Sequence, residues 1–329
     1  APLQLTQPAR LTCGATASTP RTQHIQCTHR APVTRTPPLH TTATAAARQH
    51  RPHLATADPG KDCTVLNTDG INTITLAELN SEASLLTRMD RKYLVPPTDA
   101  QNVIDILAPK AQVLQIDGLR SFQYASTYFD TPSLDAFFLA AYKRRRRYKV
   151  RTRTYLDSDL CFLEVKTNGL REATVKDRLE YSPDNADRLT DEARDFVVER
   201  LVESDTCPSD EARRIADALV PVMDTTYERT TLHLPDDSAR ATIDASLTWG
   251  ALGPDGARTD RRMAIKGLTV METKNPSAAA PTDRLLWAQG HRPTRLSKYA
   301  TGMAVLHERL PTNRWHRTIT RDLDRYQRE

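Results

Sequence analysis

From Ile74 onwards the chain carries short runs in which apolar and polar residues alternate, and turn residues bound each run. Alternation with a period of two is typical of a strand that buries one face, so each run predicts a β-strand. Eight strands are predicted, at residues 85–95, 122–129, 148–155, 162–167, 173–181, 225–234, 240–249 and 267–274.

Six stretches between these strands have helical spacing instead, at residues 100–107, 134–142, 189–202, 210–219, 281–289 and 297–310. Asp130-Thr131-Pro132-Ser133 predicts a turn that leads into a capped helix. No internal repeat is present. Antiparallel strands with helices between some of them predict an α+β fold, and eight strands suit a closed antiparallel β-barrel flanked by helices.

Residues 1–75 differ in kind from the rest. They are crowded with Thr, Pro, Arg and His, their first acidic residue is Asp58, and they show no periodicity. Such a segment cannot bury enough apolar area to offset its conformational entropy, so we expect a disordered basic extension. A tail that binds anions, a targeting extension and a stretch outside the mature protein are all compatible with it. We expect one folded domain at 80–312 and a charged C-terminal tail at 313–329.

Composition narrows the class of protein. Hydrophobic residues make up 39% of the 329 residues, which is enough for a core. No apolar run is long enough to span a membrane, and no secretory signal is recognisable. The five cysteines are widely spaced with no CxxC pair, which argues against a disulfide framework or a zinc site. A cytoplasmic protein is the simplest expectation.

The charges gather on particular faces of the predicted strands. The formal net charge of +5 indicates an anionic partner. Side chains at i, i+2 and i+4 of a strand share one face. Seven of the eight strands carry such a charged face, formed by Arg88, Asp90 and Lys92; Lys149, Arg151 and Arg153; Glu164 and Lys166; Lys176, Arg178 and Glu180; Tyr227 and Arg229; Arg240 and Asp244; and Glu272 and Lys274.

Two arrangements fit these faces. An open sheet would place its apolar face on a core and its charges in water. A closed sheet would turn the apolar face outward against helices and enclose the charges in a tunnel. Crowded cations cost on the order of 1 kcal/mol per close pair even near the surface. Polyanionic ligands, metal ions and the interleaved carboxylates would offset that cost, so the pattern favours the tunnel.

Eight motifs in a fixed order then carry a resemblance to a known family. They are Arg88-Met-Asp-Arg-Lys92-Tyr93, Tyr128-Phe-Asp-Thr-Pro132, Lys149-Val-Arg-Thr-Arg153, Phe162-Leu-Glu-Val-Lys-Thr167, Tyr227-Glu-Arg-Thr230, Arg240-Ala-Thr-Ile-Asp244, Glu272-Thr-Lys274 and Ser297-Lys-Tyr299. In this order they resemble the VTC polyphosphate-polymerase domain, within the triphosphate tunnel metalloenzyme (CYTH-like) superfamily. Residues 1 to about 80 lie outside the resemblance.

The resemblance implies an eight-stranded tunnel that holds phosphates. It implies that Glu272 is a carboxylate ligand of Mn²⁺ or Mg²⁺, and that Tyr227 donates a hydroxyl in the wall. Further substrate contacts would come from Ser297, Lys176 and Arg178, although salt bridges to Glu180 or Glu172 suit the last two equally well. The phosphate ligands implied by the matching motifs are Lys92, Arg151, Arg153, Lys166, Arg229, Arg240 and Lys298. Which residue of 143–147 faces the tunnel stays open.

The implied activity is transfer of the ATP γ-phosphate to a growing polyphosphate chain, with ATP and inorganic polyphosphate as partners. Two alternatives remain: a tunnel triphosphatase, in which Glu164 or Glu272 with the metal would activate water, and a non-catalytic module that binds polyphosphate or inositol phosphates. Nucleic acid is not an expected partner, because no recognised binding motif is present and aromatic residues make up only 6%.

Overall fold

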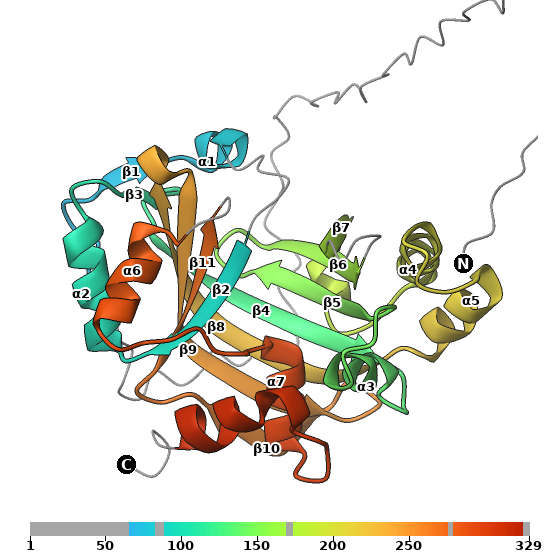
Figure 1. Cartoon of the computed structure of the whole chain (residues 1–329). Helices are drawn as coiled ribbons and strands as arrows, with labels where there is room; N and C mark the ends of the chain where they lie inside the picture. Colours follow the sequence, from blue (N-terminus) through green and yellow to red (C-terminus); the bar gives the residue numbers. More distant parts are fainter. Residues whose placement is uncertain (1–65, 83–88, 169–173, 276–278, 325–329) are drawn as a thin grey trace, which may run out of the picture. The chain divides into compact units, whose positions relative to one another are not determined.

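The computed structural model describes residues 66–82, 89–168, 174–275 and 279–324, all within the unit that runs from Ala57 to Glu329 (Figure 1). The predicted basic extension falls largely on residues 1–65, outside the described residues. One large sheet dominates, with helices on both of its sides. The α+β class predicted from the alternating pattern is therefore confirmed.

Eight antiparallel strands follow one another across the sheet in the order β2–β11–β9–β8–β4–β5–β6–β7. These are the eight strands that alternation predicted. Their bounds are β2 (Met89–Val95), β4 (Ser121–Asp130), β5 (Tyr148–Tyr155), β6 (Leu160–Asn168), β7 (Thr174–Tyr181), β8 (Val220–Leu234), β9 (Ala239–Leu252) and β11 (Thr269–Asn275).

Three further strands were not predicted. β1 (Asn72–Ile74) and β3 (Gln112–Leu114) pair in parallel, and β10 (Arg258–Ala264) pairs with β9. Three residues are too few for alternation to show, and β10 is polar at almost every position and mostly exposed. β1 also lies inside the segment 1–75 that we expected to be disordered.

The sheet is curved but not closed, which corrects the predicted barrel. Among the described residues, β2 pairs only with β11 and β7 only with β6, so the two edges do not join. The register of β8 and β9 is irregular between Thr226 and Glu228, and the facing stretch of β9 contains Ser246 at a φ of 54°. A bulge of this kind bends the strands. Both edges carry cations on the concave side, Lys92 in β2 and Lys176 in β7.

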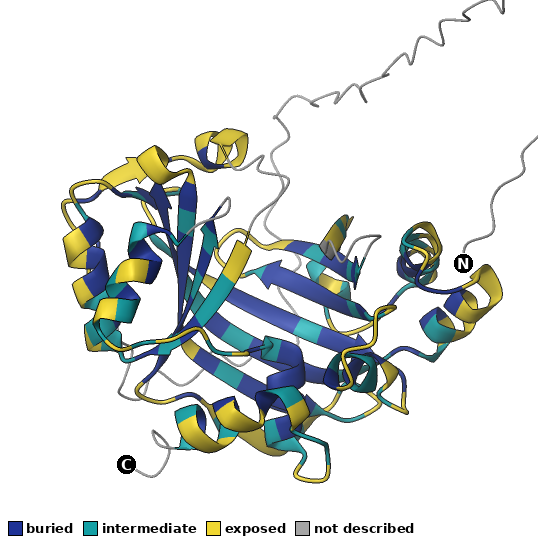
Figure 2. Cartoon of the chain, in the orientation of Figure 1, coloured by how far each residue is buried: buried dark blue, intermediate teal, exposed yellow. Residues whose placement is uncertain are grey.

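Helices cover the convex side at both ends of the strand order. Near β2, Val103 and Leu286 from two helices bury Tyr93, Ile243 and Met271. The helices, with their exposed outer faces visible in Figure 2, are α1 (Leu76–Glu82), α2 (Pro97–Leu107), α3 (Asp135–Ala141), α4 (Asp191–Glu203), α5 (Ser209–Ala218), α6 (Pro281–Ala288) and α7 (Lys298–Leu306). None of these helices, in the ranges that the structure describes, is long and apolar enough to cross a bilayer.

At the other end, α4 and α5 cover β5 and β6. Val150, Leu163 and Val165 point away from the charged face and are fully buried with Val197 and Leu201. The predicted division of these strands into a charged and an apolar face is thus seen in the structure. The apolar faces form the core, so the charged faces are left on the concave side.

α7 is the exception, because it packs on β8, β9 and β10 together with α3. Its Gly302 lies so close to Trp249 that an added Cβ would be 2.5 Å from the indole ring, so only glycine permits this approach. Trp315 and Leu323 from η4 (Asn313–Trp315) and η5 (Thr318–Leu323) join the same core. The start of the segment expected to be a charged tail is therefore packed.

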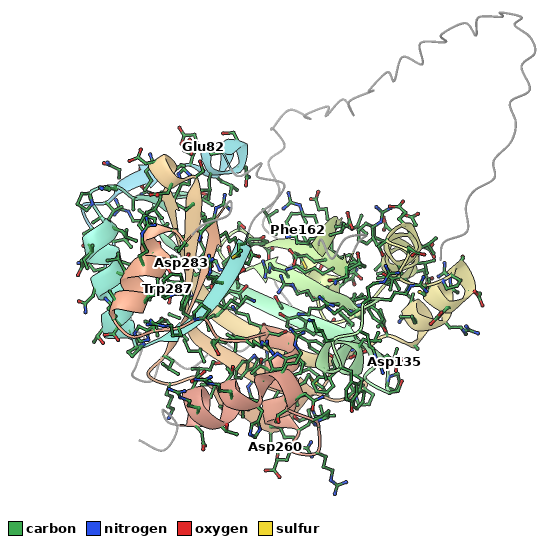
Figure 3. The ribbon with its side chains drawn as sticks, in the orientation of Figure 1. Glu82, Asp135, Phe162, Asp260, Asp283 and Trp287 are labelled. Atoms are coloured by element: carbon green, nitrogen blue, oxygen red, sulfur yellow. The ribbon has the colours of Figure 1, made fainter. Side chains whose placement is uncertain are left out.

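Asp283 fastens α6 to the edge of the sheet (Figure 3). Its fully buried carboxylate accepts hydrogen bonds from Tyr93 at 2.6 Å, Thr273 at 2.7 Å and Asn275 at 2.5 Å, and pairs with Arg91 at 3.2 Å. We expect Asp283→Ala to lower the free energy of unfolding by about 3 kcal/mol, because several buried donors and one cation lose their acceptor.

Urea denaturation measures this loss. Asp260→Ala is the matched control, since Asp260 is exposed on β10 and forms no ion pair with another described residue. Equal stability of the two variants would contradict the assignment.

Candidate functional site

The strand register places charged side chains opposite one another on the concave side. Lys149 in β5 lies opposite Lys166 in β6, which lies opposite Lys176 in β7. One step along, Arg151 lies opposite Glu164, and Glu164 opposite Arg178. Cations that face each other across neighbouring strands repel, so this arrangement requires carboxylates or bound anions to stabilise it.

Glu164 is the carboxylate that holds the β5–β7 cations. It is 1% exposed and accepts two hydrogen bonds from Arg151, at 2.8 and 2.5 Å, and one from Lys176 at 2.8 Å. Arg153 lies 3.9 Å from its second oxygen. Burial alone would raise the pKa of Glu164, but these three cations hold it far below its ordinary value. Glu164 is therefore ionised and holds these cations in place.

Asp244 plays the same part on the other half of the sheet. Its buried carboxylate accepts hydrogen bonds from Arg229 in β8, at 2.5 and 2.8 Å, and from Lys298 in α7. Ser297, the N-cap of α7, in turn accepts a bond from Lys149 at 3.1 Å. The start of α7 therefore links β9 to β5, and these contacts bring cations from distant strands together.

Glu272 in β11 is held more loosely. Its carboxylate oxygens lie 4.0 Å from Lys92 and 3.4 Å from Lys274, and the side chain is 14% exposed. Burial would raise its pKa, but Lys92 and Lys274, with smaller effects from Arg229 and Lys298, hold the pKa well below 4.5. Glu272 is thus a charged carboxylate without a tight partner among the described residues.

Two lysines on the concave side lack a carboxylate partner among the described residues. In those ranges Lys166 has no hydrogen bond or ion pair, and the one hydrogen bond of the Lys149 side chain goes to the Ser297 hydroxyl. Burial, followed by Lys92 and Arg151, lowers the pKa of Lys149 to about 7. Burial, followed by Arg151 and Lys149, lowers the pKa of Lys166 well below 10.5. Each lysine therefore gives up part of its positive charge, and a bound anion would favour the charged form again.

Aromatic rings line the floor beneath these cations. Arg151 lies over Tyr128 at 5.6 Å, Arg153 over Tyr124 at 5.5 Å, and Lys298 over Tyr227 at 4.5 Å. The buried Tyr227 hydroxyl has no hydrogen-bond partner. Burial would raise the pKa of Tyr227, but the surrounding arginines and Lys298 lower it. An unpartnered hydroxyl among cations is available to an anionic ligand.

Not every residue singled out from the sequence joins this group in the same way. Arg240 lies on the same face but donates to the Leu79 carbonyl of α1 at 2.9 Å. Arg178 packs over the ring of Phe162 at 4.8 Å (Figure 3). The Ser297 hydroxyl is already engaged as a helix cap. The residues gathered most closely are Lys92, Lys149, Arg151, Arg153, Lys166, Lys176, Arg229, Glu272 and Lys298.

Lys149 and Asp244 were absent from the predicted ligands, although the pattern of faces contained both. Lys149 lies two residues before Arg151 on the same face, and Asp244 shares a face with Arg240. Residues 122–129 contain no charged side chain that would place Tyr124 and Tyr128 beneath the arginines, although Tyr128 begins the motif Tyr128-Phe-Asp-Thr-Pro132.

The residues present fit a divalent metal that substrate oxygens help to hold. Within the ranges that the structure describes, no three His, Cys, Asp or Glu side chains group into a complete metal site. Asp244 and Glu164 are saturated by cations, whereas Glu272 is charged and loosely paired. Mg²⁺ and Mn²⁺ accept one or two carboxylates together with phosphate oxygens and water, so a single carboxylate suits such an ion.

A model of the VTC domain family matches residues 87–307. No curated protein sequence matches the chain. A solved structure of the putative adenylyl cyclase HpAC1 from Hippeastrum, described as having a dominant triphosphatase activity, is 17% identical, covers 66% of this chain and 95% of its own, and has a TM-score of 0.41. PH1012 from Pyrococcus horikoshii OT3 is 12% identical, covers 62% and 88%, and has a TM-score of 0.32.

Asp244→Asn tests the role of Asp244 in holding its two cations. Without the charge, Arg229 and Lys298 remain beside each other uncompensated, so we expect the free energy of unfolding to fall by about 3 kcal/mol. Burial would raise the pKa of Asp244, but Arg229 and Lys298 lower it to about 2, below its ordinary 3.8. This contribution is therefore fully present above about pH 4 and is lost as pH falls through about 2.

Chemical denaturation between pH 2 and pH 7 provides the measurement, with the exposed Asp236→Asn as control. A loss for Asp244→Asn that did not shrink on acidification would sink the interpretation.

Proposed function

The chain belongs to the VTC domain family, and from that premise we propose that it is a metal-dependent polyphosphate polymerase. It transfers the γ-phosphate of ATP to the end of an inorganic polyphosphate chain and releases ADP. The observation that supports this best is the concave face itself, where arginines held by carboxylates surround two lysines that have no carboxylate partner within the described ranges. Such a face is complementary to a flexible, highly charged phosphate chain.

The proposed role of each cation on the concave face depends on whether it already pairs with a carboxylate. Lys166 and Lys149 bind phosphate oxygens directly, since neither pairs with a carboxylate in the described part of the chain. The arginines make bidentate contacts, for which their planar guanidinium is suited. The full set of proposed phosphate ligands is Lys92, Lys149, Arg151, Arg153, Lys166, Arg229, Arg240 and Lys298, with Lys176, Arg178, Tyr227 and Ser297 as further substrate contacts and Glu272 as the metal ligand.

The reaction requires little covalent help from the protein. A terminal phosphate oxygen of the chain attacks the γ-phosphorus of ATP, and the bond from that phosphorus to the β–γ bridging oxygen breaks. The acceptor oxygen is already ionised, so no general base is needed. The chain's own arginines and lysines hold donor and acceptor in line and stabilise charge on the transferred group. A Mn²⁺ or Mg²⁺ ion beside Glu272 would add a further positive charge at the phosphates.

The pairing of the carboxylates weighs against hydrolysis of triphosphate as the main activity. A hydrolase needs a group that accepts a proton from water. Glu164 is fully engaged by Arg151 and Lys176 and has a pKa far below its ordinary value, so it is a poor base. Asp244 is likewise engaged, by Arg229 and Lys298, so Glu272 is the most loosely held of these three carboxylates and the better candidate for that role.

Incubating the full chain with ATP and Mn²⁺ tests the proposal. We expect ADP and long phosphate chains, resolved by gel electrophoresis. We expect Glu272→Ala to lower kcat by at least about 100-fold, since the metal stabilises charge in the transition state. Binding of tripolyphosphate without metal should persist in this variant.

Glu192→Ala, at an exposed position of α4, is the matched control and should keep wild-type activity. Free phosphate as the sole product would indicate a hydrolase, and binding without turnover would indicate a non-catalytic module. Full activity of Glu272→Ala would remove the metal assignment.

Lys149 should take up a proton when a phosphate chain binds. Its pKa of about 7 leaves it mostly neutral at pH 8, and an anion beside it favours the charged form. Calorimetry of tripolyphosphate binding at pH 8, in buffers of different ionisation enthalpy, measures this uptake. We expect Lys149→Met to take up fewer protons than wild type, and Lys110→Met, at an exposed position in the turn after α2, to match wild type. Equal uptake in all three proteins would contradict this role.

A further inference from the structure

Three arginines outside the concave face lie near one another beside Lys149. Arg147 comes directly before β5, Arg295 lies between α6 and α7, and Arg314 is in η4. Arg314 is beyond residues 87–307, the part of the chain that the VTC model matches. The three therefore come from segments that are distant in sequence.

Packing brings these segments together. Trp315, next to Arg314, is buried and its ring lies 5.9 Å from that of Phe137 in α3, the helix that precedes Arg147. Thr318 donates a hydrogen bond to the Arg295 carbonyl at 3.0 Å. Burial, followed by Arg295 and Arg147, lowers the pKa of Arg314, as expected for neighbouring guanidinium groups.

These three arginines have no carboxylate partner among the residues that the structure describes. Within that part of the chain, neither Arg295 nor Arg314 makes a hydrogen bond or ion pair through its side chain, and Arg147 donates only to the Arg144 carbonyl. By contrast, Arg213 and Arg214 on α5 pair with Asp195 and Asp210. Neighbouring cations without counter-charge are costly unless an anion binds them.

The group is continuous with the concave face. Arg147 is two residues before Lys149 and contributes to lowering the pKa of that lysine. Arg295 is two residues before Ser297, which accepts the hydrogen bond from Lys149. A cationic path therefore runs from Lys166 through Lys149 to these arginines.

We propose that Arg147, Arg295 and Arg314 form a second binding site for phosphate oxyanions, which holds the part of a polyphosphate chain that extends past Lys149. This inference rests on the proposed function, because it assumes that the concave face binds the rest of the same chain. The site makes affinity depend on chain length, since a short oligophosphate occupies the concave face alone.

The double variant Arg295→Ala/Arg314→Ala tests this site. Calorimetry compares its binding of tripolyphosphate with its binding of long-chain inorganic polyphosphate, at several salt concentrations. We expect affinity for the long chain to fall about tenfold at low salt, as for two lost ion pairs. The slope of log Kd against log salt should become shallower by about two, one for each arginine. Tripolyphosphate binding should stay at the wild-type level.

Arg213→Ala/Arg214→Ala removes the same charge from α5 and is the control, expected to bind both probes as the wild type does. Unchanged long-chain binding in the double variant would overturn the inference and leave the proposed function intact. Equal weakening of the binding of both probes would also overturn it. So would binding of a second tripolyphosphate molecule by the wild type that the double variant no longer binds. If the wild type binds neither probe, the proposed function itself fails and the inference with it.

Discussion

The structure depends on the pairing of cations with a few buried carboxylates on the concave face of the sheet. Glu164 holds Arg151 and Lys176, and Asp244 holds Arg229 and Lys298. Without these pairs, cations on neighbouring strands would repel one another across distances of a few ångströms. The carboxylates thus fix the positions of the arginines before any ligand arrives, and preorganised charge of this kind is what stabilises a transferred phosphoryl group.

The buried carboxylates do not pair with every cation of the concave face. Asp244 and Glu164 pair with arginines, but among the described residues Lys166 has no hydrogen bond or ion pair and the Lys149 side chain donates only to a hydroxyl. The pKa of each lysine is lowered, so the empty face reduces its own charge and recovers it when anions bind. Glu272 is paired more loosely than Glu164 or Asp244. The metal ligand is therefore proposed at Glu272.

The convex side of the sheet buries apolar side chains against helices. Val150, Leu163 and Ile243 point outward into two cores covered by helices. A third core lies under α7 and includes Tyr128, Tyr227 and Trp249. α7 crosses to the concave side, where Gly302 lets it approach Trp249, and its first turn carries Lys298. The segments on either side of α7 extend the positive charge through Arg295 and Arg314, past the limit of the family match.

The sequence by itself determined the eight principal strands, the α+β class and the division of seven of these strands into a charged and an apolar face, because a period of two is a local property. It also supplied the motifs from which Glu272 and Lys166 were predicted as site residues. Only the tertiary structure decided that the sheet stays open, that Arg240 bonds to Leu79, and that Asp244 joins Arg229 to Lys298. Edge pairing and cross-strand ion pairs depend on which segments meet in space, and no local periodicity records that.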